Sequence, residues 1–109
     1  MPYDEKLANR VRDILEAQPG LREQKMFGGL CYMLHGNMAV GVETNRLMVR
    51  VGPNAYQDAL AKPHARPMDL TGRPMKGIIW VDAPGIRDKR ALRRWIQRGL
   101  DFADSLPPK

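Results

Sequence analysis

Cysteine and histidine are the side chains best suited to bind a transition metal, and the chain has one cysteine, Cys31, and two histidines, His35 and His64. Cys31 and His35 are four residues apart in a stretch with the pattern of a β-strand, which separates them by roughly 13 Å. That distance is too great for both to hold one ion. His64 has no other ligand at metal-binding spacing. We therefore expect no metal site and no cofactor.

Motifs that build common catalytic sites are missing from the sequence. It contains no nucleophile elbow, P-loop, dinucleotide-binding glycine pattern or paired-carboxylate motif. The segment Met26-Phe27-Gly28-Gly29 lacks the lysine and the spacing of a phosphate cradle. We expect these four residues to form a structural corner, in which Met26 and Phe27 anchor a glycine turn on the core. We therefore expect a noncatalytic protein. An enzyme with a dispersed site around His64 ranks third, after a protein-interaction module and a nucleic-acid-associated protein.

Positive charge is the strongest chemical feature of the chain. Its 18 Lys and Arg against 12 Asp and Glu give a net charge of +6, which favours acidic partners such as nucleic acid or an anionic protein surface. On a helix that begins near Asp88, the side chains of Arg90, Arg93 and Arg94 share one polar face. This face is either simply solvated or contacts phosphates or another anionic partner.

The segment from His64 to Gly77 contains the tripeptide Arg-Pro-Met twice. A two-residue turn at Thr71-Gly72 would make the repeat the two arms of a hairpin, with Met68 opposite Met75. Proline cannot donate to a strand ladder, so at least one arm is expected at an edge of the sheet. The alternative is an exposed anion or partner site. Its residues would be His64, Arg66, Arg73 and Lys76.

Hydrophobic periodicity and turn residues predict one domain over residues 1–109, with a flexible tail at 105–109. Helical spacing of apolar residues predicts helices at 4–17 and 88–105, and a short helix between Pro53 and Pro63. Three short runs with strand periodicity lie between Gly29 and Val51, and two later runs include the strand at 78–81. The order is α-β(3)-α-β(2)-α, an α+β fold with helices packed on an antiparallel sheet.

The pairing of the first three strands depends on two turn dipeptides, Gly36-Asn37 and Thr44-Asn45. With two central residues in each turn, one face of the sheet forms the core: Cys31, Met33, Met38, Val40, Val42, Leu47, Val49 and Val51. The opposite face then carries Leu30, Tyr32, Leu34, Ala39, Gly41, Glu43, Arg46, Met48 and Arg50. This second face is too apolar to meet only water. We expect the rest of the chain or a second copy to cover it, with Tyr32, Leu34 and Met48 as a candidate dimer face.

The stretch KMFGGLCYMLHGNMAVGV, Lys25 to Val42, resembles the N-terminal domain of the TfoX/Sxy family. The resemblance continues through RLMVRVG, a TGRP turn, GIIWVDAP and a closing helix, and so covers nearly the whole chain. It implies an α-β(3)-α-β(2)-α domain similar to type III secretion chaperones. Two-domain members of the family are linked to the regulation of natural competence and are thought to act on transcription. The family offers no catalytic residues to transfer.

These observations favour a noncatalytic regulatory or protein-interaction module that forms a homodimer. The alternative is a basic protein that associates with nucleic acid in transcriptional regulation. Its phosphate contacts would be Arg90, Arg93 and Arg94, with Arg66 and Arg73 as additional contacts. Lys76 completes the set of candidate contacts for an anion or a partner. No run approaches the roughly 20 apolar residues that span a bilayer, and the start of the chain has no apolar leader, so we expect a cytoplasmic protein without membrane contact.

Overall fold

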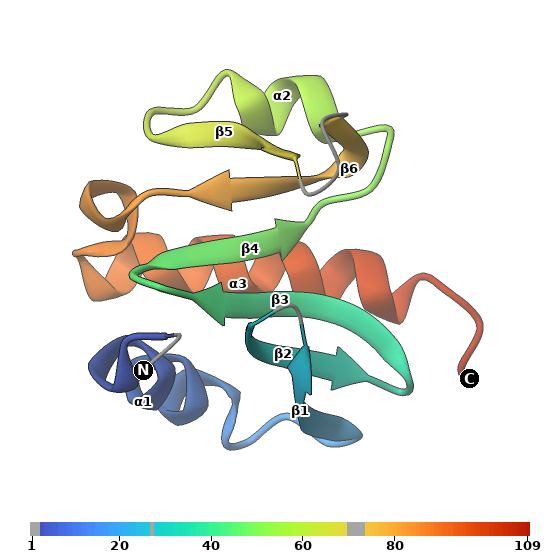
Figure 1. Ribbon diagram of the computed structural model, residues 1–109. Coiled ribbons are helices and arrows are strands. Elements are labelled where there is room, and N and C mark those ends of the chain that lie inside the picture. Colours follow the sequence, from blue (N-terminus) through green and yellow to red (C-terminus); the bar gives the residue numbers. More distant parts are fainter. Residues whose placement is uncertain (1–2, 27, 70–73) are drawn as a thin grey trace.

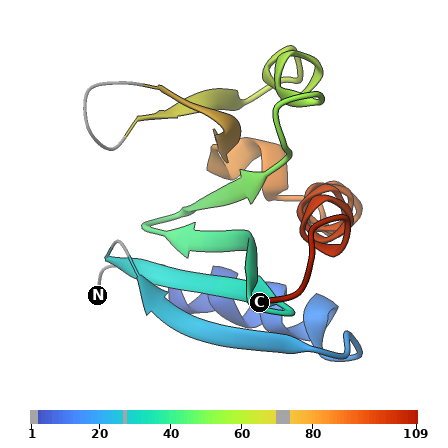
Figure 2. The same cartoon turned by 90° about the vertical axis from the view of Figure 1, so that its right-hand side faces the viewer.

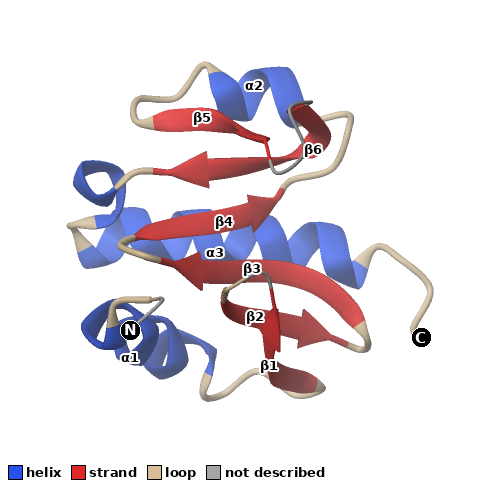
Figure 3. Ribbon diagram, viewed as in Figure 1, coloured by secondary structure: helices blue, strands red, loops and turns tan. Residues whose placement is uncertain are grey.

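The computed structural model describes residues 3–26, 28–69 and 74–109, with only the backbone described at Asp69, Pro74 and Met75. Within these residues the chain forms an α+β domain with three α-helices and one antiparallel sheet (Figure 1 and Figure 3). In chain order the elements are α1 (Glu5–Leu15), β1 (Leu21–Met26), β2 (Gly29–Leu34), β3 (Asn37–Glu43), β4 (Arg46–Arg50), α2 (Tyr56–Leu60), β5 (Ala65–Asp69), β6 (Pro74–Val81), the 3₁₀ helix η1 (Ala83–Ile86) and α3 (Lys89–Asp104).

The sheet has the strand order β1-β2-β3-β4-β6-β5. The predicted fold class is therefore confirmed, with one correction: four strands, not three, precede α2. The sequence pattern missed β1 because its four central side chains are all exposed and polar, as is common for a strand at a sheet edge. At the other edge lies β5, which contains Pro67, as the proline argument requires.

All three helices contribute to the main core, which lies on one face of the sheet. Figure 2 shows α3 along one side of the sheet. The β1–β2 strand pair lies at one edge of the sheet and the β5–β6 pair at the other. Apolar side chains from α3 face this core with helical spacing. Those that are buried are Leu92, Trp95, Ile96, Leu100 and Ala103. The stripe that predicted this helix is thus the surface that holds it against the sheet.

Two aspartates begin the long helices where the sequence predicts. The Asp4 carboxylate accepts a hydrogen bond from the backbone N–H of Lys6 at 2.8 Å, and α1 follows directly. Asp88 accepts one from the N–H of Ala91 at 3.3 Å at the start of α3. Each aspartate satisfies a backbone donor that the first helical turn would otherwise leave free.

The β2–β3 turn differs from the predicted one by one residue. Its central residues are His35 and Gly36, with φ of 52° and 85°, and Leu34 pairs with Asn37. The sequence favoured Gly36-Asn37 because glycine and asparagine are preferred at the central positions of a two-residue hairpin turn. Asn37 instead enters β3, where its buried side chain donates to the carbonyl of Pro107 at 2.9 Å.

The shifted turn moves β2 relative to the prediction, and the register changes once more between Tyr32 and Met33. Tyr32 therefore pairs with Val40, where Met33 was predicted. A slip of one residue turns every side chain of a strand to the other face. Leu30, Tyr32 and Leu34 consequently lie in the main core, as does Ala39 of β3. The assignment of Cys31, Met33 and Met38 to that core is wrong. The β3–β4 pairing agrees with the prediction, since Val42 pairs with Leu47.

The C-terminal residues 105–109, which were expected to be flexible, run beside the β2–β3 turn. The backbone N–H of Lys109 donates to the carbonyl of His35 at 2.9 Å. Together with the bond from Asn37 to Pro107, this ties the tail to the turn.

The predicted turn at Thr71-Gly72 lies outside the described residues. The backbone pairing of Asp69 with Pro74 is the one that this turn requires. The register then shifts, so that Pro67 pairs with Ile79.

None of the helices in the described residues is both long enough and apolar enough to cross a lipid bilayer.

Candidate functional site

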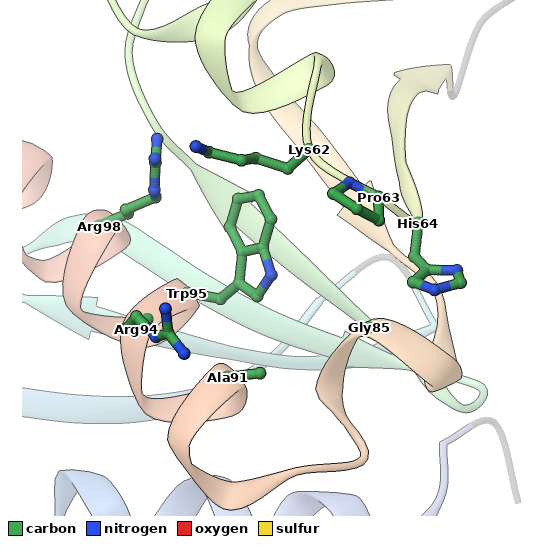
Figure 4. A pocket seen from close by; sticks show the side chains of 8 residues that line it. All are labelled: Lys62, Pro63, His64, Gly85, Ala91, Arg94, Trp95 and Arg98. Atoms are coloured by element: carbon green, nitrogen blue, oxygen red, sulfur yellow. The ribbon is translucent and has the colours of Figure 1, made fainter.

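A basic pocket of about 330 Å³ lies between α3, η1 and the turn that joins α2 to β5 (Figure 4). It is lined by Lys62, Pro63, His64, Gly85, Ala91, Arg94, Trp95 and Arg98. Three separate chain segments bring these residues together. We call this site the basic pocket.

Positive groups surround an indole ring in the basic pocket. The guanidinium of Arg98 lies 5.3 Å from the ring centre of Trp95, within reach of a cation–π interaction. Figure 4 shows Lys62 and Arg98 along one end of this ring and Arg94 near its base. Arg98 also contacts the carboxylate of Asp58 at 3.1 Å, and it is the one lysine or arginine of the pocket with a carboxylate partner among the described residues.

Backbone hydrogen bonds hold the turn that carries Lys62 and His64. The N–H of Lys62 donates to the carbonyl of Ala59 at 3.1 Å, and the Lys62 carbonyl accepts from Ala65 at 3.3 Å. The His64 carbonyl accepts from the N–H of Asp82 at 2.9 Å. These bonds fix His64 at a φ of 68°, which is unfavourable for a residue with a Cβ atom. The turn therefore presents the two side chains in a defined position.

Gly85 allows η1 to approach this turn closely. A Cβ atom added at Gly85 would lie 2.9 Å from the Cβ of His64 and 2.9 Å from Cγ1 of the buried Val81. Such contacts are shorter than carbon atoms tolerate, so glycine is needed for the pocket wall to close on His64.

We expect Gly85→Ala to lower the free energy of unfolding by about 1–2 kcal/mol, because the new methyl group overpacks this contact. Urea unfolding of the variant and of the wild-type protein measures the change. His64→Gly removes one colliding atom and relieves the positive φ, so the double variant should lose less than Gly85→Ala alone. Equal losses in the single and double variants would show that the His64 contact is not the cause.

Among the described residues, two that were predicted to contact an anion or a partner line the basic pocket, namely Arg94 and His64. Arg90 and Arg93 are exposed elsewhere on α3, and Lys76 is exposed on β6. Arg66 makes a two-pronged ion pair with Asp82, with nitrogen–oxygen distances of 2.7 and 2.8 Å.

The remaining predicted anion contact, Arg73, lies outside the described residues. The ion pair to Asp82 raises the pKa of Arg66 and occupies its guanidinium. Arg66 therefore does not line the basic pocket with Arg94.

The sequence interpretation missed Lys62, Trp95 and Arg98 as site residues. Trp95 and Arg98 have the spacing of neighbours on a helix surface, and Arg94 lies one turn before Arg98. That spacing is a usable signal, but Trp95 also fits the apolar stripe of α3 and was assigned to the core. Lys62 carries no local signal, because its approach to α3 depends on tertiary structure.

The candidate dimer face is corrected by the structure. Tyr32 and Leu34 are each 1% exposed and lie in the main core beneath the helices of the same chain. Met48 is 2% exposed and belongs to a cluster on the opposite face of the sheet. These three residues therefore do not form one exposed surface. The homodimer prediction was based on that surface and has no support from it.

A second apolar cluster occupies the other sheet face, and all its members are strand residues. It contains Cys31, Met48, Met68, Ile78 and Trp80, with Met26, Met33 and Met38 packed against them. Every methionine whose side chain is described lies in this cluster. Burial raises the pKa of the Cys31 thiol, so the thiol stays protonated near neutral pH. Arg46, paired with Glu43, lies over the Trp80 ring at 3.9 Å from its centre.

The residues of the predicted corner connect β1 to β2. Gly28 has a φ of 77°, and a Cβ atom on Gly29 would collide with the carbonyl oxygen of Val42. Met26 is partly buried in the second apolar cluster, and Phe27 lies outside the described residues. In residues 3–26, 28–69 and 74–109, no three His, Cys, Asp or Glu side chains are grouped as a metal site would require.

Comparison with known proteins identifies the family of the chain. The model of the TfoX N-terminal domain matches residues 13–103. The matched residues span β1 to β6, α2 and all but the last residue of α3, with only the end of α1. No curated protein and no solved structure matches the chain. The match confirms the resemblance seen in the sequence and fits the α+β fold: the chain belongs to the TfoX N-terminal domain family.

Proposed function

We propose that this TfoX N-terminal domain is a noncatalytic regulatory module that docks an acidic segment of a partner protein at the basic pocket. The observation that carries the proposal is the gathering of Lys62, Arg94 and Arg98 at one hollow beside Trp95. Aromatic and arginine side chains are the residues that most often dominate binding energy at protein interfaces. The positive net charge of the chain favours the encounter with an acidic partner.

Neutralising the basic pocket is expected to abolish capture of the partner. We expect the Lys62→Gln, Arg94→Gln double variant to lose proteins that the wild-type chain retains from an extract of its own cells. The measurement is a pull-down followed by mass spectrometry. A matched control, Arg22→Gln with Lys25→Gln, removes the same charge from exposed positions on β1, at the far edge of the sheet. Equal retention by the pocket variant and the control would contradict the proposal.

A second candidate function is association with nucleic acid, favoured by the exposed Arg90 and Arg93 beside Arg94 on α3. Treating half of the extract with nuclease separates the two functions in the same experiment. Retention that survives nuclease and depends on Lys62 and Arg94 supports an acidic protein partner. Retention that disappears with nuclease, and weakens steeply with salt as counterions are released, supports nucleic acid.

A further inference from the structure

The polar side chains that line the basic pocket provide hydrogen-bond donors and no carboxylate. Lys62, Arg94 and Arg98 are cationic donors, the indole of Trp95 has one N–H group, and the imidazole of His64 has one N–H group when neutral and two when protonated. No acceptor for that N–H is found among the described residues, and its edge of the ring faces Pro63 and Gly85 in Figure 4. The complement of such a lining is an anion that accepts several hydrogen bonds.

Phosphate matches this lining better than a carboxylate does. A phosphate monoester has three terminal oxygens and a charge of about −1.5 to −2 at neutral pH, whereas a carboxylate has two oxygens and one charge. Arginine binds phosphate through paired N–H groups, and lysine binds it as a point charge.

The size and the apolar wall of the basic pocket indicate that the anion carries an organic group. A volume of about 330 Å³ lies at the lower end of the range for small-molecule sites. Pro63, Ala91 and the ring of Trp95 form an apolar part of the lining, which a bare phosphate would leave to water. We propose that the basic pocket binds a phosphate monoester of about nucleotide size. This inference rests on the proposed function only in using the same pocket.

The ion pair between Arg98 and Asp58 is compatible with this ligand. It consists of one contact at 3.1 Å, and the Asp58 side chain is 66% exposed. Exposed ion pairs of this kind contribute little stability. A phosphate dianion therefore competes with Asp58 for Arg98 at a small cost in free energy. The bound phosphate then contacts the guanidinium that lies over Trp95.

The two tryptophans make a direct test with nuclear magnetic resonance of the ¹⁵N-labelled full chain. Trp95 lines the basic pocket, while Trp80 lies in the second apolar cluster on the other sheet face and serves as an internal control. Titration with adenosine monophosphate should shift the indole N–H signal of Trp95 and leave that of Trp80 in place. We expect a dissociation constant on the order of 1 mM or tighter. Trp95→Phe assigns the two signals.

Three further probes separate the parts of the ligand. Adenosine lacks the phosphate and should bind at least about tenfold more weakly, and inorganic phosphate lacks the organic group and should also bind more weakly. Ribose 5-phosphate shows whether the sugar phosphate suffices without the base. Adenosine binding as tightly as the monophosphate, inorganic phosphate binding as tightly as either ester, or no Trp95 shift at roughly 10 mM ester would overturn the inference.

Charge variants connect the binding to the named residues. Lys62→Gln and Arg94→Gln should each weaken binding of the monophosphate about tenfold, while Arg22→Gln and Lys25→Gln leave it unchanged. The remaining amide signals report whether each variant is folded. If the monophosphate does not bind while partner capture still depends on Lys62 and Arg94, the inference is wrong and the proposed function stands. Monophosphate binding without partner capture would support the inference and contradict the proposed function.

Discussion

Gly99→Ala is expected to destabilise the domain by about 2 kcal/mol, although alanine is the better helix former. Gly99 is where α3 crosses β3, and an added Cβ atom would collide with the carbonyl oxygen of Ala39 and lie 2.7 Å from Cγ1 of Val40. A backbone carbonyl in a sheet cannot move aside as a side chain can. Overpacking at the upper end of its usual range costs about 3 kcal/mol, while the change in helix propensity returns about 1 kcal/mol.

The measurement for Gly99→Ala is thermal and urea unfolding of the variant. A loss of this size lowers the melting temperature of a domain of about 100 residues by roughly 10 °C. Gln97→Ala, at an exposed position of the same helix, is the control and should stay within about 0.5 kcal/mol of the wild-type protein. If Gly99→Ala were as stable as the wild-type protein, α3 would not pack on β3 as closely as the structure shows. A Val40→Ala second change should not rescue it, because the carbonyl of Ala39 remains.

Helices were the part of this fold that local sequence could predict. The bounds of α1 and α3 follow from a capping aspartate and an apolar stripe, which are both local features. The strand β1 was missed because its formation depends on pairing with β2 and not on the periodicity of its own residues. Its polar sequence, LREQKM, has no apolar alternation that would distinguish it from a loop.

The register of β2 could not be settled from turn propensities. Gly36-Asn37 is a good turn on local grounds, and His35-Gly36 forces a positive φ on histidine. Tertiary interactions decide the choice, because Asn37 and His35 both bond to the C-terminal tail, which lies 70 or more positions later in the chain. The same limit applies to the basic pocket. Arg94 and Arg98 are neighbours on a helix, but Lys62 reaches them only through the fold.

Tyr32→Ala is expected to cost about 3–5 kcal/mol, a larger loss than that expected for Gly99→Ala. Tyr32 is 1% exposed in the main core and lies near Arg12 and Leu15 of α1, so removing its ring leaves a cavity there. The loss is a large part of the stability of an average domain, and the variant should be mostly unfolded at elevated temperature. Urea unfolding at neutral pH measures it, with circular dichroism to follow the helices.

Met33→Ala is the matched control for this change, because Met33 follows Tyr32 directly and points to the other sheet face. Its side chain is only partly buried, so its loss should cost about 1 kcal/mol. The sequence-based register exchanges the two positions and predicts the reverse order, with the methionine in the main core. A larger loss for Met33→Ala than for Tyr32→Ala would therefore contradict the β2 register of the structure.

The hydroxyl of Tyr32 makes the free energy of unfolding depend on pH. Its geometry gives it no hydrogen-bond partner among the described residues. Burial, and next to it the charge of the nearby Glu23 carboxylate, raise the pKa of Tyr32 above its ordinary value of about 10. Above pH 10 the unfolded chain loses this proton while the folded chain keeps it. The phenol therefore leaves the free energy of unfolding unchanged below pH 10 and lowers it as the pH rises further. The loss from this group is at most about 1.4 kcal/mol per pH unit. Tyr32→Phe keeps the ring, should match or exceed the wild-type stability at pH 7, and should lose less of it between pH 10 and pH 11. An equal loss in both proteins would show that the phenol is not buried in the fold.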